Sequence, residues 1–287
     1  MRNKVIYKTV NLNGVKIFYR ESGNKNHPTI LLFHGFPASS HMYRNLIEEL
    51  ADEYHIIAPD YPGFGNSDQP HPKEFEYTFD NLANVMNDFI EDIKLSKYSI
   101  YVHDYGAPVG FRLAARSPER IQAIITQNGN AYEEGLLSSW DPIRKYWQNP
   151  SEENKENIRK LLTPDFTKFQ YVNGTRSPES ISPDSWNLDQ YVLDRPGNKE
   201  VQLTLFYDYQ NNLKLYPSWH EYFRMHQPPT LVAWGKNDVF FGVEGALAFQ
   251  KDLNDVELHL LNTGHFPLEE DLDVSTSLII RFLSERF

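Results

Sequence analysis

Short apolar segments alternate with amphipathic segments along most of this chain, and this alternation constrains its fold more than any other feature. The short segments have the length of buried strands, and the segments between them repeat apolar residues every three or four positions, as helices do. We predict strands over residues 29–33, 55–58, 98–102, 121–126, 230–234 and 256–261. Because strand and helix alternate, the strands are expected to form a mostly parallel sheet flanked by helices on both faces.

The alternation is interrupted once, between residues 131 and 228. That stretch has no clear buried strand, has many prolines, and contains four of the five tryptophans of the chain. We interpret it as a mostly helical insertion whose aromatic residues cover a site. The chain is therefore expected to have an α/β core over residues 1–130 and 229–287 and a helical cap over residues 131–228.

Composition excludes several classes of function. The chain carries 28 Lys and Arg against 39 Asp and Glu, a net charge of −11, which argues against nucleic acid and anionic membranes as partners. It has no Cys and no H-E-x-x-H motif, so we expect no disulfide, no thiol chemistry and no metal site. Asp68 stands where the third glycine of a dinucleotide fingerprint belongs, so no cofactor is expected either.

The hydropathy of the chain predicts the location of the protein in the cell. Its apolar runs are too short to cross a bilayer, and its first residues do not form a secretory signal. We therefore expect a soluble, cytoplasmic protein with no membrane association. The sequence leaves its oligomeric state open.

The segment around Asp104 is the strongest chemical signal. Residues 102–107 join a predicted strand to a predicted helix through a tight turn, the context of the nucleophile elbow G-x-S-x-G. Asp104 stands at the serine position of that motif, and Val102 replaces its first glycine. The alternative is that Asp104 only caps the helix that follows, a common role for Asp.

His265 and Asp238 complete a candidate triad with Asp104. Asp238 follows the strand that ends at residue 234, and His265 follows the last strand. The order nucleophile, acid, histidine is the order along the chain in α/β-hydrolases. A lone His near a strand end is more often structural, but three candidates in this order, each after a strand, are harder to obtain by chance. Glu133 or Glu134, after the strand predicted at residues 121–126, is the alternative acid.

The turn His34-Gly35-Phe36-Pro37 directly follows the first buried strand. Such a turn can point the backbone N–H of Phe36 at a developing negative charge, with the N–H of Tyr105 as a second donor. We therefore predict an oxyanion hole made by Phe36 and Tyr105. The alternative is an ordinary turn in which His34 hydrogen-bonds the loop.

Over nearly its whole length the chain resembles the α/β-hydrolase superfamily. The segment 59–68 is similar to a usual loop of that family, and Asp104 together with His34-Gly35-Phe36-Pro37 resembles its epoxide hydrolase and haloalkane dehalogenase branch. The resemblance implies an α/β-hydrolase fold with an inserted cap. One departure is Tyr105, because both families usually place Trp directly after the nucleophile.

Two segments of the insertion resemble those that carry the ring-opening tyrosines of epoxide hydrolases. They are residues 146–150 and 209–211, so the resemblance implies that Tyr146 and Tyr209 donate protons to a departing oxygen. The alternative for each tyrosine is that it only packs in an aromatic cap. In a dehalogenase, Trp140 or Trp147 would instead hold a departing halide.

A carboxylate nucleophile narrows the reaction. Attack by Asp104 on a carbonyl would give a reactive anhydride, whereas attack on saturated carbon gives a stable alkyl ester. We therefore expect an epoxide hydrolase that forms an ester on Asp104 and hydrolyses it with water activated by His265. The alternatives are a haloalkane dehalogenase with the same triad and a non-catalytic binding protein on this scaffold.

The expected substrate is a small apolar organic molecule, which reacts with water; its identity and stereochemistry stay open. We predict a pocket between core and cap. Its predicted lining residues are His34, Pro37, Trp140, Trp147 and Phe266.

Overall fold

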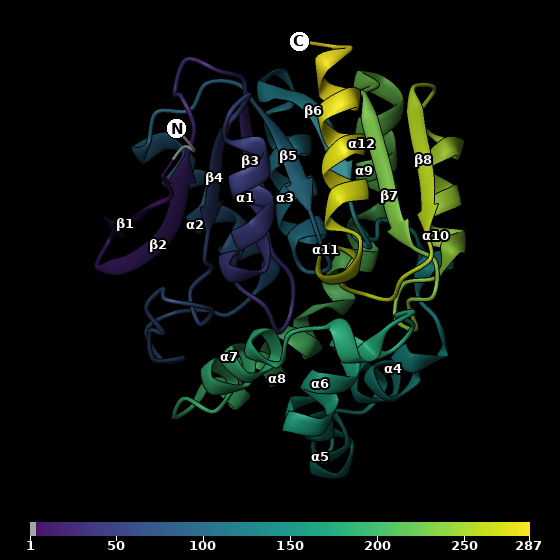
Figure 1. The fold of residues 1–287 in the computed structure, drawn as a ribbon. Coiled ribbons are helices and arrows are strands. Elements are labelled where there is room, and N and C mark those ends of the chain that lie inside the picture. Colours follow the sequence, from purple (N-terminus) through teal and green to yellow (C-terminus); the bar gives the residue numbers. More distant parts are fainter. Residues whose placement is uncertain (1–3) are drawn as a thin grey trace.

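The computed structural model describes residues 4–287 and contains an eight-stranded sheet with helices on both faces (Figure 1). The strand order is β1-β2-β4-β3-β5-β6-β7-β8. The first two strands pair antiparallel with each other, and β2 pairs antiparallel with β4, while the strands from β3 onward run parallel. The predicted α/β fold with a mostly parallel sheet is confirmed.

The strands lie close to where the apolar runs predict them. Their bounds are β1 Ile6–Leu12, β2 Val15–Ser22, β3 Thr29–Phe33, β4 His55–Pro59, β5 Tyr98–Val102, β6 Ile121–Thr126, β7 Thr230–Gly235 and β8 Val256–Leu261. All residues of β3, β4, β5 and β7 are buried. Strands covered on both faces bury both sets of side chains, which explains their continuous apolar sequences.

Helices cover the two faces of the sheet and bury two hydrophobic clusters. α1 (Arg44–Leu50) and α12 (Leu272–Ser284) contribute to one cluster. The other face carries α2, α3, α9 and α10, whose bounds are Phe79–Asp92, Gly106–Arg116, Gln210–His226 and Val243–Ala248. In α2 the apolar residues Phe79, Leu82, Met86 and Phe89 recur every three or four positions and are buried, and Thr78 caps the helix by accepting a hydrogen bond from the N–H of Asn81.

Between β6 and β7 the chain forms six α-helices, and the first five of them gather at one end of the sheet, below it in Figure 1. They are α4 Asp141–Gln148, α5 Glu152–Arg159, α6 Pro164–Val172, α7 Pro183–Leu193 and α8 Asn198–Asp208. Within residues 4–287 no helix is both long and apolar enough to span a bilayer.

Helix α9 departs from the predicted division into core and cap. It lies beside the sheet rather than with the helices of the insertion, and Phe111 of α3 contacts its Trp219 and Phe223 at ring-centroid distances of 5.6 Å and 5.4 Å. We propose that the cap comprises residues 131–209 and that α9 belongs to the core, although the sequence prediction extended the cap to residue 228.

Candidate active site

Four loops meet at the end of the sheet that faces the inserted helices. Phe36 follows β3, Asp104 follows β5, Asp238 follows β7 and His265 follows β8. These strands run parallel, so their carboxyl ends lie at the same edge, where open α/β sheets build their sites. The fold therefore brings together residues that are far apart in sequence.

Asp104 lies in a strained turn between β5 and α3. Its φ angle is +48°, in the left-handed region that non-glycine residues seldom adopt. The turn is closed by a hydrogen bond of 2.7 Å from the N–H of Gly106 to the carbonyl of His103. A Cβ atom on Gly106 would lie 2.1 Å from the carbonyl oxygen of Phe33, so only glycine fits there. The turn places the Asp104 side chain among the residues that line a cavity.

Two backbone N–H groups hold the Asp104 carboxylate. Its Oδ1 accepts a hydrogen bond of 2.6 Å from the N–H of Phe36, and the carboxylate also accepts one from the N–H of Tyr105. A Cβ atom on Gly35 would lie 2.3 Å from the Cβ of Asp104, so the close approach of the two loops requires glycine there. The donors predicted to form an oxyanion hole thus already point at the carboxyl group.

The environment of Asp104 opposes its charge. Burial raises the pKa of its carboxyl from 3.8 to about 6, although His265 and the two N–H donors each favour the ionised form. The carboxylate is therefore less well solvated than in water while it is still mostly ionised at neutral pH. This is a suitable state for a nucleophile.

His265 is oriented by Asp238. Its Nδ1 lies 2.8 Å from Oδ2 of Asp238, and both side chains are buried. Burial alone lowers the pKa of His265, but the carboxylates of Asp238 and Asp104 outweigh burial, and the pKa is raised above 6.5. With Nδ1 donating to Asp238, Nε2 is left to act as a base.

Asn128, which the sequence analysis missed, fixes Asp238. It follows β6, and its side-chain amide donates to Oδ2 of Asp238 at 2.8 Å while its Oδ1 accepts from the N–H of Gly235. The alternative acids lie elsewhere: Glu133 is exposed, and Glu134 pairs with Lys251. The structure thus brings Asp238, and neither glutamate, into contact with His265.

A cavity of about 420 Å³ opens over Asp104 and His265. Phe36, Tyr105 and the predicted pocket residue Trp140 also line it. The other lining residues were not predicted, and they are Ser138, Ser139, Ile143, Leu161, Phe166, Phe169, Gln170, Phe206, Val239 and Phe240. Because most of these side chains are apolar, the cavity suits a small apolar molecule.

Four residues predicted for the pocket are not among those that line it. His34 is fully buried behind the loop, where its Nε2 accepts from the N–H of Tyr61 at 3.3 Å. Pro37 is buried in the same loop. Trp147 donates its indole N–H to the carbonyl of Phe206 at 2.7 Å, and Phe266 stacks on Tyr171 with ring centroids 4.1 Å apart.

The two cap tyrosines also lie outside the cavity lining. Helix α4 presents Ile143 to the cavity, and Tyr146, one turn later, packs against Tyr207 at 5.3 Å between ring centroids. Tyr209 is closer to the site: its ring lies 4.5 Å from Trp140 and 5.9 Å from Tyr105, and both of these line the cavity.

Within residues 4–287 no cluster of three or more His, Asp or Glu side chains could hold a metal ion. The site just described contains one His and two Asp, and each has a protein partner: the carboxylates accept backbone or amide N–H groups, and His265 donates to Asp238. What the arrangement offers chemically is a buried carboxylate held by two backbone N–H groups and an imidazole that is paired with a second carboxylate.

Comparison with known proteins places this geometry in context. Residues 28–272 match the family model described as alpha/beta hydrolase fold. The chain is 44% identical over 277 residues to an uncharacterized hydrolase of Saccharomyces cerevisiae, with 95% of each chain covered. It is 28% identical over 292 residues to epoxide hydrolase 4 of Mus musculus, a match that covers 97% of this chain and 79% of that protein.

A solved structure shows the same fold. Haloalkane dehalogenase DatA from Agrobacterium tumefaciens, crystallised as a mutant, superposes with a TM-score of 0.81 and 19% sequence identity. The superposition covers 98% of this chain and 97% of that one.

Proposed function

The chain belongs to the α/β-hydrolase family and is a hydrolase, and we propose that it opens epoxides to diols through a covalent ester on Asp104. The observation that carries this proposal is a carboxylate, rather than a hydroxyl, at the nucleophile position, facing the His265–Asp238 pair across an apolar cavity. A carboxylate that attacks saturated carbon gives a stable alkyl ester, whereas one that attacks a carbonyl gives a reactive anhydride.

In the first step an oxygen of Asp104 attacks one carbon of the epoxide. The bond between that carbon and the ring oxygen breaks, its electron pair passes to the oxygen, and the oxygen takes a proton. The product is a hydroxyalkyl ester on Asp104. Because Oδ1 is held by the N–H of Phe36, Oδ2 is the oxygen left to attack, and Oδ1 becomes the carbonyl oxygen of the ester.

In the second step Nε2 of His265 takes a proton from water, and the water oxygen attacks the ester carbonyl carbon. The negative charge that develops on Oδ1 is held by the N–H groups of Phe36 and Tyr105, which already contact the carboxyl group. The tetrahedral intermediate then releases the diol, which takes the proton from His265 and leaves Asp104 as a carboxylic acid. Loss of that proton, which balances the one taken by the ring oxygen in the first step, regenerates the carboxylate. One such oxyanion donor is commonly worth ~10²–10³ in rate.

The surroundings of the indoles favour an epoxide over a haloalkane. A departing halide needs free N–H donors, but the N–H of Trp140 already donates to the carbonyl of Phe240 at 3.1 Å, and that of Trp147 to the carbonyl of Phe206.

Dehalogenation by the same triad and non-catalytic binding are the rival functions. A panel of epoxides and haloalkanes, scored for diol and for halide, separates all three: we expect diol without halide, and binding without any turnover would refute catalysis.

We propose Tyr209 as the proton donor for the opened ring. It is buried, its ring lies next to two residues that line the cavity, and its hydroxyl is hydrogen-bonded with that of Tyr216. Tyr146 was predicted for the same role, but its contact with Tyr207 gives that role no support.

The two tyrosines form a matched pair for a test. Tyr209→Phe keeps the ring and removes the hydroxyl, and we expect it to slow ester formation from an epoxide by ~10²-fold, because general acid help is worth ~10²–10⁴. Tyr146→Phe is the control, with an expected change of less than about twofold, since its ring packs against Tyr207, which does not line the cavity, whereas the ring of Tyr209 contacts two lining residues. Rapid-mixing measurement of the rate of ester formation in the wild type and both variants tests this prediction. Equal rates for Tyr209→Phe and the wild type would remove Tyr209 from the mechanism.

A further inference from the structure

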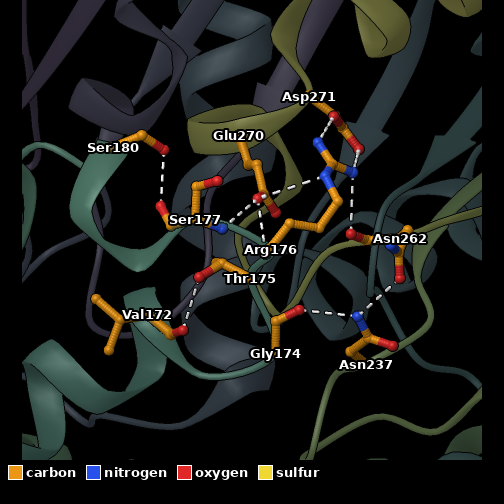
Figure 2. A network of polar contacts seen from close by, with 10 residues as sticks. All are labelled: Val172, Gly174, Thr175, Arg176, Ser177, Ser180, Asn237, Asn262, Glu270 and Asp271. Carbon is orange, nitrogen blue, oxygen red and sulfur yellow. Dashed lines mark hydrogen bonds and ion pairs between the residues drawn. The ribbon is translucent and has the colours of Figure 1, made fainter.

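The loop between α6 and α7 lies directly against the two loops that carry Asp238 and His265 (Figure 2). We call residues 173–177 of this loop the clasp. Gly174 has a φ angle of +79°, and a Cβ atom there would lie 2.6 Å from the carbonyl oxygen of Asn237. A Cβ on Gly264 would lie 2.0 Å from the carbonyl oxygen of Asn173. The clasp therefore touches the residue before the acid and the residue before the histidine.

Asn237 connects the clasp to both catalytic loops. Its side-chain amide donates to the carbonyl of Gly174 at 2.8 Å and to Oδ1 of Asn262 at 3.2 Å. Its own backbone N–H donates to the carbonyl of Thr263 at 3.1 Å. The loop after β7 and the loop after β8 are thus tied to each other and to the cap through one residue adjacent to Asp238.

Arg176 spans the segment that contains His265. Its Nη1 donates to the carbonyl of Asn262 and to Oδ2 of Asp271, both at 2.9 Å, and its Nη2 donates to Oδ1 of Asp271 at 2.5 Å. Its backbone N–H donates to Oε1 of Glu270 at 2.7 Å. Figure 2 shows the guanidinium between Asn262 and Asp271, which lie on either side of His265 in sequence.

We propose that Arg176 is a positioning residue for His265. By holding both ends of residues 262–271, it fixes the loop on which His265 meets Asp238 and the ester carbonyl. Arg176 is not among the residues that line the cavity, so it acts through the loop and not on the substrate. The inference rests on the proposed function, because it assigns Arg176 to the second step only: His265 activates water, whereas Asp104 attacks without a base.

Replacing Arg176 should change the rate of ester hydrolysis through the position of His265 and not through the free energy of unfolding. Arg176 is 41% exposed, and exposed ion pairs contribute little to the free energy of unfolding. A displacement of about 1 Å in a catalytic group, however, can cost ~10² in rate. His265 keeps its bond to Asp238 and a bond of 2.8 Å between its carbonyl and Nε2 of His103, which limits the displacement. An intermediate loss of about tenfold is therefore expected.

The test uses Arg176→Gln and a matched control, Arg116→Gln. Arg116 is also 41% exposed and also pairs with an Asp at 2.5 Å, but it lies at the end of α3, far from His265 in the fold. With styrene oxide, or the epoxide that the wild type converts fastest, single-turnover mass spectrometry gives the rates of ester formation and ester hydrolysis. For Arg176→Gln we expect hydrolysis to slow about tenfold, ester formation to stay within about twofold, and the ester to accumulate.

Two further variants test whether slower ester hydrolysis comes from the loss of the contacts that the clasp makes. Asn237→Ala removes the other link to the clasp and should also slow hydrolysis selectively. Arg176→Lys keeps the charge but loses the planar fork that reaches Asn262 and Asp271 together, so it should restore hydrolysis only in part. Unchanged hydrolysis in Arg176→Gln overturns the proposal, and so does an equal loss in both steps with a lowered melting temperature. If neither the wild type nor His265→Gln forms an ester, the proposed function itself has failed.

Discussion

Replacing His265 with Gln should leave a protein that forms the ester on Asp104 and cannot hydrolyse it. Asp104 attacks carbon without a base, whereas water needs Nε2 of His265 to become a nucleophile. Loss of a general base is commonly worth ~10²–10⁴ in rate, so turnover should fall by that factor while ester formation continues. The variant is mixed with an epoxide that the wild type converts, and its intact mass is measured. All of the protein should then be heavier by the mass of one substrate molecule.

The matched control is His259→Gln. His259 lies on β8, the strand that precedes His265, but its side chain is partly exposed and pairs with Glu257, away from the cavity lining. That variant should turn over like the wild type and accumulate no ester. An inert His265→Gln variant that carries no adduct would contradict the division of labour between Asp104 and His265. If Asp238→Asn is fully active, Asp238 is not the acid of the triad, and Glu133 and Glu134 are the next candidates for that role.

Replacing Asp104 with Asn should abolish ester formation altogether and, at neutral pH, stabilise the fold. The carboxyl pKa is raised from 3.8 to about 6 by burial, so the folded state binds this proton more tightly than the unfolded state does. Stability therefore falls as the pH rises through this window and is lowest above pH 6, by up to about 3 kcal/mol. Asn keeps the side-chain shape and carries no charge, so the variant avoids that loss.

Urea unfolding of the wild type and of Asp104→Asn at pH 4 and at pH 7.5 measures this effect. The variant should be more stable at pH 7.5 by about 2–3 kcal/mol, and the gap should narrow at pH 4, where the wild-type carboxyl is protonated. The gain reflects the usual conflict between stability and a charged, buried nucleophile. A variant that is less stable at both pH values by the same amount would contradict a buried, poorly solvated Asp104.

Much of the core could be predicted because local sequence determines it. The buried strands are short apolar runs, and each strand from β3 to β8 lies within one residue of the predicted bounds at either end. Asp104 was identifiable because a strand, a tight turn and a helix follow one another within ten residues. The positions of Asp238 and His265 follow from strand order, since loops after parallel strands meet at one edge.

The lining of the cavity could not be predicted in the same way. Ile143, Tyr146 and Trp147 lie within two turns of α4, and a short helix with large side chains on several faces does not reveal which face meets the core. The similarity of residues 146–150 to a ring-opening segment points to Tyr146, yet the helix presents Ile143 to the cavity. Asn128 gives only a weak signal, because a single Asn after a strand is common in turns.

The covalent ester on Asp104 is the central claim, and one measurement tests it most directly. A single turnover in water enriched in heavy oxygen, with protein in excess over a convertible epoxide, should place the label in the Asp104 side chain. Water attacks the ester carbonyl of the enzyme, so one carboxylate oxygen is exchanged, and the first diol released carries oxygen that came from Asp104. Peptide mass spectrometry should find the heavy oxygen on Asp104. A labelled diol with an unlabelled Asp104 after the first turnover would contradict the account, because it would mean that water attacks the substrate directly.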